Sequence, residues 1–289
     1  MGSKWAGTVE GAFFDPVLFD RNRIINMAET HYSKRTSLKT VFYILGVDVG
    51  RYDDMTEIAV IKVTTNPNGY YVKNVVNFFT YQEPHFGQQA IYIKRLFNKF
   101  NCEAVVVDGN GPGEGLIDFL ILDQYDPDNN DPLYGFGVRN DKEGRFKKYR
   151  TPNTIRDALT IIKANQVINS ELYSYCQAQM RNGRIKFLVD ENIAKNKLMS
   201  QKQGQNMSAV QRAEYLRPYV ETSILKSQLI NLVVKGDGPN VILDRSSRKI
   251  KKDKVSALVY GLSFVKEREE TMHKRGSRDL SGFSFFTKH

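Results

Sequence analysis

The chain has 289 residues, of which 41% are hydrophobic and 26% are charged, and its formal net charge is +10. This composition is ordinary for a folded globular domain and excludes a disordered chain. No signal peptide is visible, and no apolar run approaches the roughly 20 residues that span a bilayer, so we expect no membrane partner. The positive charge favours a polyanionic partner, above all nucleic acid.

The cysteine and histidine content indicates no zinc site. Cys102 and Cys176 lie in apolar stretches and have no metal-binding spacing, and the four histidines are scattered. We therefore expect two buried free thiols, as in proteins of a reducing compartment.

The first 40 residues show no sustained periodicity, and we interpret 1–40 as an N-terminal connector that packs against a neighbouring part of the protein. From residue 41 the pattern becomes alternating and β-branched, which predicts strands over 41–49, 57–63 and 70–79. The last two are joined by an Asn-Gly turn signal, so the three should form an antiparallel meander.

The chain then alternates helices and strands. Apolar spacing predicts a helix over 87–100, followed by a buried strand over 103–108, a helix over 111–121 and a strand over 133–138.

Helical signals dominate the second half. A threonine N-cap followed by proline predicts a helix over 151–166. The remaining predicted elements are a helix over 171–180, a strand over 184–189, a long helical stretch over 207–234 whose end can be strand, a hairpin within 228–244, and a helix that starts at Asp253. We predict an α/β fold whose mixed sheet is flanked by helices on both faces, with the folded domain over 41–270 and a flexible basic tail over 271–289.

Three aspartates stand at the ends of predicted elements. Asp48 lies near the end of the first strand and Asp108 at the end of the strand after the crossover helix, so both should emerge at one edge of the sheet. Glycines follow each of them closely and admit a ligand near the backbone. Asp253, at the start of the last helix, can complete the cluster.

Clustered carboxylates repel one another unless a cation lies between them, and oxygen ligands suit Mg²⁺ or Mn²⁺. Two such ions about 3.5–4 Å apart can activate water and stabilise the leaving oxygen of a phosphodiester. The alternative is structural: Asp48 caps a turn after its strand and Asp108 begins an Asx-turn. Four nearby acids, Asp53, Asp54, Glu57 and Glu114, are interpreted as structural, and Asp118 as a surface residue.

Two basic clusters are candidates for contact with a phosphate backbone. They comprise Arg145, Lys147, Lys148 and Arg150 in the first, and Arg245, Arg248, Lys249, Lys251 and Lys252 in the second.

The motifs "GVDVG", "VVVDGNGPGEGL" and "KKDKVSALVYGL", together with the opening "GSKWAGTVEGAFF", resemble the nuclease (C-terminal) domain of the large terminase subunit of tailed bacteriophages. The resemblance spans roughly residues 3 to 266 and keeps the order of the motifs. It implies a ribonuclease H-like fold and an endodeoxyribonuclease that cuts concatemeric viral double-stranded DNA during packaging, with little sequence specificity, by two-metal hydrolysis. Asp48, Asp108 and Asp253 match the family's metal-binding acids.

The resemblance also implies partners and a place of action. The partners are the terminase ATPase domain, the small terminase subunit and the portal protein, in the cytoplasm of an infected bacterium. The chain has no Gly-Lys dipeptide and thus no phosphate loop, so we expect no ATP site.

Other functions stay open at this stage. A ribonuclease H-like resolvase or transposase would carry similar acids, and an actin- or sugar-kinase-like ATP-binding protein also has a "G-x-D-x-G" turn. The latter needs a second phosphate hairpin, for which 236–238 is the only candidate. A third possibility is a DNA- or portal-binding module whose acids are vestigial.

Overall fold

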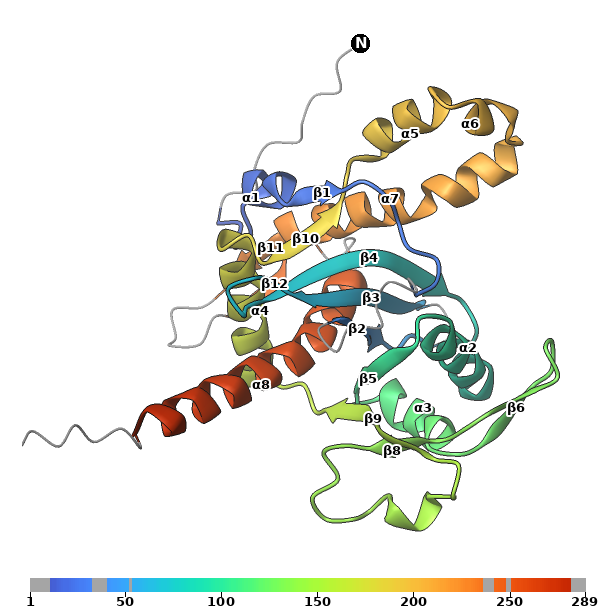
Figure 1. Ribbon diagram of the computed structural model, residues 1–289, viewed down its shortest axis with the longest axis vertical. Coiled ribbons are helices and arrows are strands. Elements are labelled where there is room, and N and C mark those ends of the chain that lie inside the picture. The colour runs from blue at the N-terminus through green and yellow to red at the C-terminus, as the bar shows by residue number, and fades with distance from the viewer. Residues whose placement is uncertain (1–10, 33–40, 52–53, 236–241, 248–250, 282–289) are drawn as a thin grey trace, which may run out of the picture.

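Eight strands form one mixed sheet in the computed structural model, which describes residues 11–32, 41–51, 54–235, 242–247 and 251–281 (Figure 1). Their spatial order is β1 (Arg23–Ile25), β10 (Ile185–Leu188), β4 (Tyr71–Tyr81), β3 (Thr56–Thr65), β2 (Val41–Asp48), β5 (Cys102–Asp108), β9 (Ile155–Ile162) and β8 (Phe136–Val138). β2, β3 and β4 pair antiparallel, whereas β5 joins β2, and β9 joins β5, in parallel. This is the ribonuclease H-like arrangement that the sequence predicts.

Helices cover both faces of the sheet, as predicted. On one face lie α2 (Phe86–Lys99) and α3 (Pro112–Leu120), whose apolar side chains share a core with Leu45, Val47 and Val105. On the other face lie α4 (Gln166–Arg181), α7 (Ala209–Ile230) and α8 (Asp253–Ser281), which share a core with Ile44 and Val106. Alternation along β2 therefore sends successive residues to opposite cores.

Helix α8 lies unusually close to the backbone of β2, because glycines face each other at the contact. A Cβ atom on Gly46 would lie 2.0 Å from the carbonyl oxygen of Ala257 and 2.6 Å from the amide nitrogen of Gly261. This close approach fixes the helix against the strand that ends in Asp48.

The predicted connector is partly built into the fold. It contributes α1 (Pro16–Arg21) and β1, which pairs in parallel with β10. Phe14 and Phe19 are each 1% exposed, and Phe19 stacks on Phe187 with 4.2 Å between ring centroids. Trp5 lies outside the described residues.

The prediction of a helix over 151–166 is wrong, because 155–162 is strand β9 and α4 begins only at Gln166. Asp157 has a φ of +53° and interrupts the strand, so consecutive residues Ala158 and Leu159 both face the same core. A regular strand cannot do this, and the irregularity imitates the apolar spacing of a helix.

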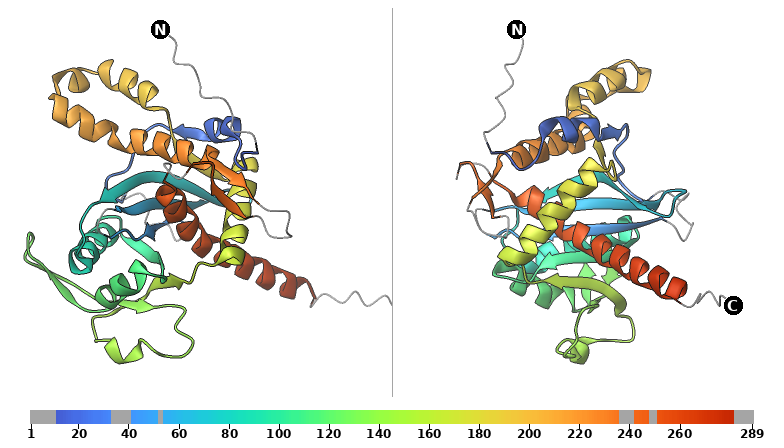
Figure 2. Two further views of the ribbon diagram at one scale, coloured as in Figure 1. Left: turned by 180° about the vertical axis from the view of Figure 1, so that it is seen from behind. Right: turned by 90° about the vertical axis from the view of Figure 1, so that its left-hand side faces the viewer.

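Two projecting segments contain elements that the sequence does not predict. A two-stranded ribbon, β6 (Gln124–Asp126) and β7 (Asp131–Leu133), extends from the sheet, and α5 (Glu191–Met199), α6 (Lys202–Asn206) and the first part of α7 form an arm (Figure 2). The predicted hairpin after α7 is confirmed as β11 (Leu232–Val234) paired with β12 (Leu243–Arg245). The last helix continues to Ser281, and the rest of the predicted tail lies outside the described residues.

Both cysteines are free and buried, as predicted. Among the described residues, none of the helices is long and apolar enough to cross a membrane.

Candidate metal centre

Asp48 and Asp108 occupy the same edge of the sheet. In the parallel pair β2–β5, Gly46 pairs with Val106 and Val47 with Val107, and each aspartate is the next residue of its strand. The predicted juxtaposition of these two residues is therefore present in the structure.

Asp253 joins them from the helix layer. It is the first residue of α8, the helix that packs on Gly46 of β2. The negative charges of both Asp253 and Asp108 act on the Asp48 carboxylate. The fold thus brings together three aspartates that are 60 and 145 residues apart in sequence.

The Asp48 carboxyl carries the electrostatic signature of this cluster. Its pKa is raised from 3.8 to about 8, first by burial and then by the negative charges of Asp253 and Asp108, against the opposing positive charge of Lys252. The side chain keeps part of its surface open to solvent. A carboxyl that is crowded by protein and by like charges is a strong candidate for binding a cation.

Asp108 is held by hydrogen bonds. Its Oδ1 accepts from the amides of Asn110 (3.1 Å) and Ala164 (3.2 Å), and its Oδ2 accepts from the hydroxyl of Tyr260 (3.3 Å). The bond from Asn110 is the Asx-turn considered in the structural interpretation, so Asp108 both closes a turn and faces the cluster. Burial and the charges of Asp48 and Asp108 raise the pKa of Tyr260, which therefore remains a donor.

A buried ion cluster adjoins the aspartates, and no pattern in the sequence predicts it. The ammonium of Lys254, a residue only 2% exposed, lies 2.6 Å from Glu57 and 2.7 Å from Glu221, and donates to the hydroxyl of Thr80 at 3.0 Å. Its partners lie up to 197 residues away along the chain, so local patterns cannot reveal them. Glu57, which the sequence analysis interprets as structural, pairs with Lys254, and its charge also acts on Asp48.

The donor chemistry of the centre fits a hard divalent cation. In the described part of the chain, no three histidine, cysteine or carboxylate side chains are arranged to enclose a metal ion by themselves. Mg²⁺ does not require such a cage, since it usually keeps several waters and takes only one or two carboxylates. Asp48, Asp108 and Asp253 would hold the ion through their oxygens together with waters.

The first basic cluster lies on the exposed loop between β8 and β9, which contains a short 3-10 helix, Lys147–Tyr149 (Figure 1). Arg145, Lys147, Lys148 and Arg150 are all exposed. Arg145 also lines a pocket of about 390 Å³ with Lys142, Lys163 and Gly109, the residue after Asp108. Arg145 is thus the member of the cluster that lies beside the segment following Asp108, and Lys142 and Lys163 are additional cations there that sequence reasoning missed. Four acids, Glu114, Asp118, Asp141 and Glu143, line the same pocket.

The second basic cluster is only partly described. Lys251 is exposed and lies 3.2 Å from Asp54, Lys252 acts on Asp48, and Arg245 is half-buried at the end of β12. Arg248 and Lys249 lie outside the described residues, as do Asp53 and the 236–238 turn.

Two further acids, Glu114 and Asp118, line the pocket that contains Arg145 and Gly109. Glu114 is exposed and lies 3.8 Å from Arg145, and Asp118 is an exposed residue of α3, as expected.

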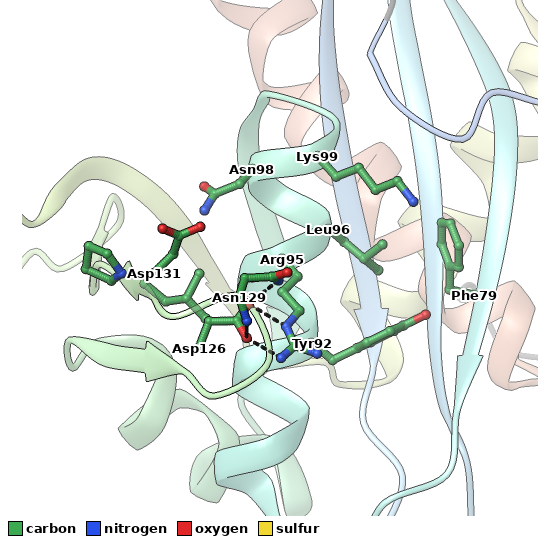
Figure 3. A pocket seen from close by; sticks show the side chains of 11 residues that line it. Phe79, Tyr92, Arg95, Leu96, Asn98, Lys99, Asp126, Asn129 and Asp131 are labelled. Atoms are coloured by element: carbon green, nitrogen blue, oxygen red, sulfur yellow. Dashed lines mark hydrogen bonds and ion pairs between the residues drawn. The ribbon is translucent and has the colours of Figure 1, made fainter.

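A larger pocket of about 590 Å³ lies elsewhere, between α2 and the β6–β7 ribbon (Figure 3). Arg95 spans it and donates two hydrogen bonds to the carboxylate of Asp126, one of them 2.7 Å long from Nε. The three aspartates and the two basic clusters do not line this pocket, so it is separate from the candidate metal centre.

Comparison with known proteins gives matches only among solved structures. No family model and no curated protein matches the chain. The large terminase nuclease from thermophilic phage G20c with bound magnesium is 13% identical, with a TM-score of 0.46 over 85% of this chain and 96% of that one. The HK97 bacteriophage large terminase is 11% identical, with a TM-score of 0.44 over 86% of this chain and 43% of that one.

A third similar structure is the manganese-soaked terminase nuclease domain of human cytomegalovirus, at 9% identity and a TM-score of 0.43 over 87% of this chain and 94% of that one. At such low identities these structures do not define the function of this chain, which has to be inferred from the chemistry of its own carboxylates.

Proposed function

We propose that this protein is a metal-dependent endonuclease that cuts double-stranded DNA with little sequence preference during viral genome packaging. The observation that carries the proposal is the convergence of Asp48, Asp108 and Asp253, with the pKa of Asp48 raised to about 8. A site that favours a bound cation over three free negative charges is what phosphodiester hydrolysis requires.

The three aspartates and the basic loop have different roles in the proposed reaction. Asp48 and Asp253 offer carboxylate oxygens for which the described residues show no hydrogen-bond donor, and Asp108 presents its oxygens in a fixed orientation through Asn110, Ala164 and Tyr260. Two divalent ions, Mg²⁺ or Mn²⁺, would supply an activated water and stabilise the leaving oxygen. The exposed cations of the β8–β9 loop would hold the phosphate backbone beside this edge of the sheet.

We also propose a biological setting, which follows from the motifs. The chain would act on concatemeric DNA in the cytoplasm of an infected bacterium, joined to a packaging ATPase and working with the small terminase subunit and the portal protein. Its own cleavage reaction would need no ATP.

Incubation with supercoiled plasmid tests the proposal. We expect nicked and linear products with Mn²⁺ or Mg²⁺, none in EDTA, and no stimulation by ATP. Asp48→Ala, Asp108→Ala and Asp253→Ala should each lose cleavage by at least about a hundredfold, whereas Asp118→Ala should not. Undiminished cutting in EDTA would refute the dependence of cleavage on metal. A strong preference for four-way junctions over linear duplex would favour a resolvase instead.

A further inference from the structure

Two side chains of α7 bind the first turn of α8. Glu221 and Gln228 are seven residues apart and so lie on one face of that helix. Glu221 lies 2.7 Å from the Lys254 ammonium, while the side-chain oxygen of Gln228 accepts hydrogen bonds from the amides of Lys254 (3.0 Å) and Val255 (3.4 Å).

The side chain of Gln228 caps the N-terminus of α8. The first amides of a helix lack partners within the helix and are usually bonded by the side chain just before it. The residue just before α8 is Lys252, whose side chain has no hydrogen-bond acceptor. The cap therefore comes from α7, and the place where α8 begins depends on a tertiary contact.

Two residues of the sheet contact the same turn. The Lys254 ammonium also bonds Glu57 of β3 and Thr80 of β4, so its three protons meet three oxygens from three separate elements. Buried ion clusters of this kind often add little net stability, and in some proteins they specify geometry instead.

The position of Asp253 depends on these contacts to the first turn of α8 more than the positions of the other two aspartates do. Asp48 and Asp108 lie in paired strands, and Asp108 accepts three hydrogen bonds. For the Asp253 carboxylate, the described residues show no hydrogen bond. The Cα atoms of Asp253 and Lys254 are about 3.8 Å apart, as in any trans peptide. Contacts that fix the backbone of Lys254 therefore also fix the point from which the Asp253 side chain extends.

We propose that Lys254, Glu221 and Gln228 are positioning residues that place the Asp253 carboxylate against Asp48 for metal binding. This inference rests on the proposed function of the centre. It assigns to a buried lysine, outside the set of metal-binding acids, a role in metal affinity that it exerts through Asp253.

Electrostatics and positioning predict opposite effects when Lys254 is neutralised. Loss of a positive charge near the centre would strengthen the binding of a cation. Loss of the contacts that position Asp253 would weaken cation binding by about tenfold to a hundredfold, the range found when residues that orient metal ligands are changed. The sign of the change therefore separates the two explanations.

The experiment compares Lys254→Met with Lys73→Met. Lys73 is a matched control, because it is a fully buried lysine that bonds Gln179 at 2.9 Å and pairs with Glu269 at 2.5 Å, away from the aspartates. Mn²⁺ affinity is measured by calorimetry, amide exchange of the segment 253–258 by mass spectrometry without metal, and plasmid cleavage against metal concentration. Gln228→Ala keeps the test possible if Lys254→Met fails to fold, and Lys254→Arg should restore much of the affinity.

We expect Lys254→Met and Gln228→Ala to accelerate exchange at the start of α8 and to weaken Mn²⁺ binding at least tenfold, with cleavage partly recovered at high Mn²⁺. Lys73→Met should lose stability but keep its Mn²⁺ affinity within twofold. Unchanged or tighter Mn²⁺ binding in Lys254→Met, or an equal loss in Lys73→Met, overturns the inference and leaves the proposed function intact. Absence of Mn²⁺ binding in the wild-type protein would instead reject the proposed function, and this inference with it.

Discussion

Asp48 and Asp108 stand side by side because Val47 and Val107, the residues just before them, are paired in neighbouring parallel strands. Two backbone ladders hold these carboxylates in place, and Asp253 approaches them from a helix. The charge of this arrangement makes the stability of the protein depend on pH and on metal.

Stability without metal should fall as the pH rises from about 4 to about 8. The pKa of Asp48 is about 8 in the folded protein and near its ordinary 3.8 in the unfolded chain. Between these values the folded state keeps a proton that the unfolded state has released, so raising the pH favours unfolding. Chemical denaturation in EDTA should show Asp48→Asn to be more stable than wild type at pH 9, on the order of a few kcal/mol, and nearly equal to it at pH 4. A matched Asp118→Asn variant should follow the wild-type curve, and a wild-type curve parallel to that of Asp48→Asn would contradict the assignment.

Metal binding should release a proton below pH 8. An ion held by Asp48 needs the carboxylate form, which is the minor form at pH 6.5 because its pKa is about 8. Calorimetric titration with Mn²⁺ at pH 6.5, in two buffers of different ionisation enthalpy, should give about one released proton per first ion bound. Heats that do not depend on the buffer would show that Asp48 is already ionised or takes no part.

The β8–β9 loop should supply DNA affinity that is independent of sequence. Each phosphate contact contributes about 0.9 to the slope of log affinity against log salt. The Arg145→Gln, Lys147→Gln, Lys148→Gln, Arg150→Gln variant should therefore bind unrelated duplexes more weakly and with a flatter salt slope. Neutralising Lys195, Lys197 and Lys202, in the α5–α6 arm, is the matched control; an equal flattening there would mean that the arm contacts DNA too.

The N-terminal segment should behave as part of the core. Phe19→Ala removes a side chain that is 1% exposed and stacked on Phe187, and it should destabilise the protein by about 3–5 kcal/mol. Val17→Ala, in the same helix but at a side chain 71% exposed, should change stability by less than about 0.5 kcal/mol. Denaturant unfolding measures both, and equal effects would mean that α1 does not pack as described.

The sequence predicted those features that follow from local alternation and strand order. The meander, the parallel strand ending in Asp108 and the helix beginning at Asp253 all carry unbroken apolar patterns. Strand β9 was mistaken for a helix because the interruption at Asp157 places Ala158 and Leu159 on one face. There the pairing with β5 outweighs the helix-start signal at Thr151 and Pro152.

Contacts between distant segments could not be predicted. Lys254 follows a predicted metal ligand and looks like one more basic residue of a charged run, yet it is buried between Glu57 and Glu221. Likewise, the residues from Pro16 to Ile25 lack periodicity because the helix and strand they form are only six and three residues long. Such elements are stabilised by the body of the fold rather than by their own pattern.

The central claim is that Asp48, Asp108 and Asp253 together bind divalent metal, and anomalous diffraction from crystals soaked in Mn²⁺ tests it most directly. The account predicts one or two anomalous peaks at the edge of the sheet where β2 and β5 end, within about 2.0–2.4 Å of carboxylate oxygens of these aspartates, and their loss in Asp48→Asn. Well-diffracting crystals with Mn²⁺ bound elsewhere, or with no peak between these side chains, would contradict it.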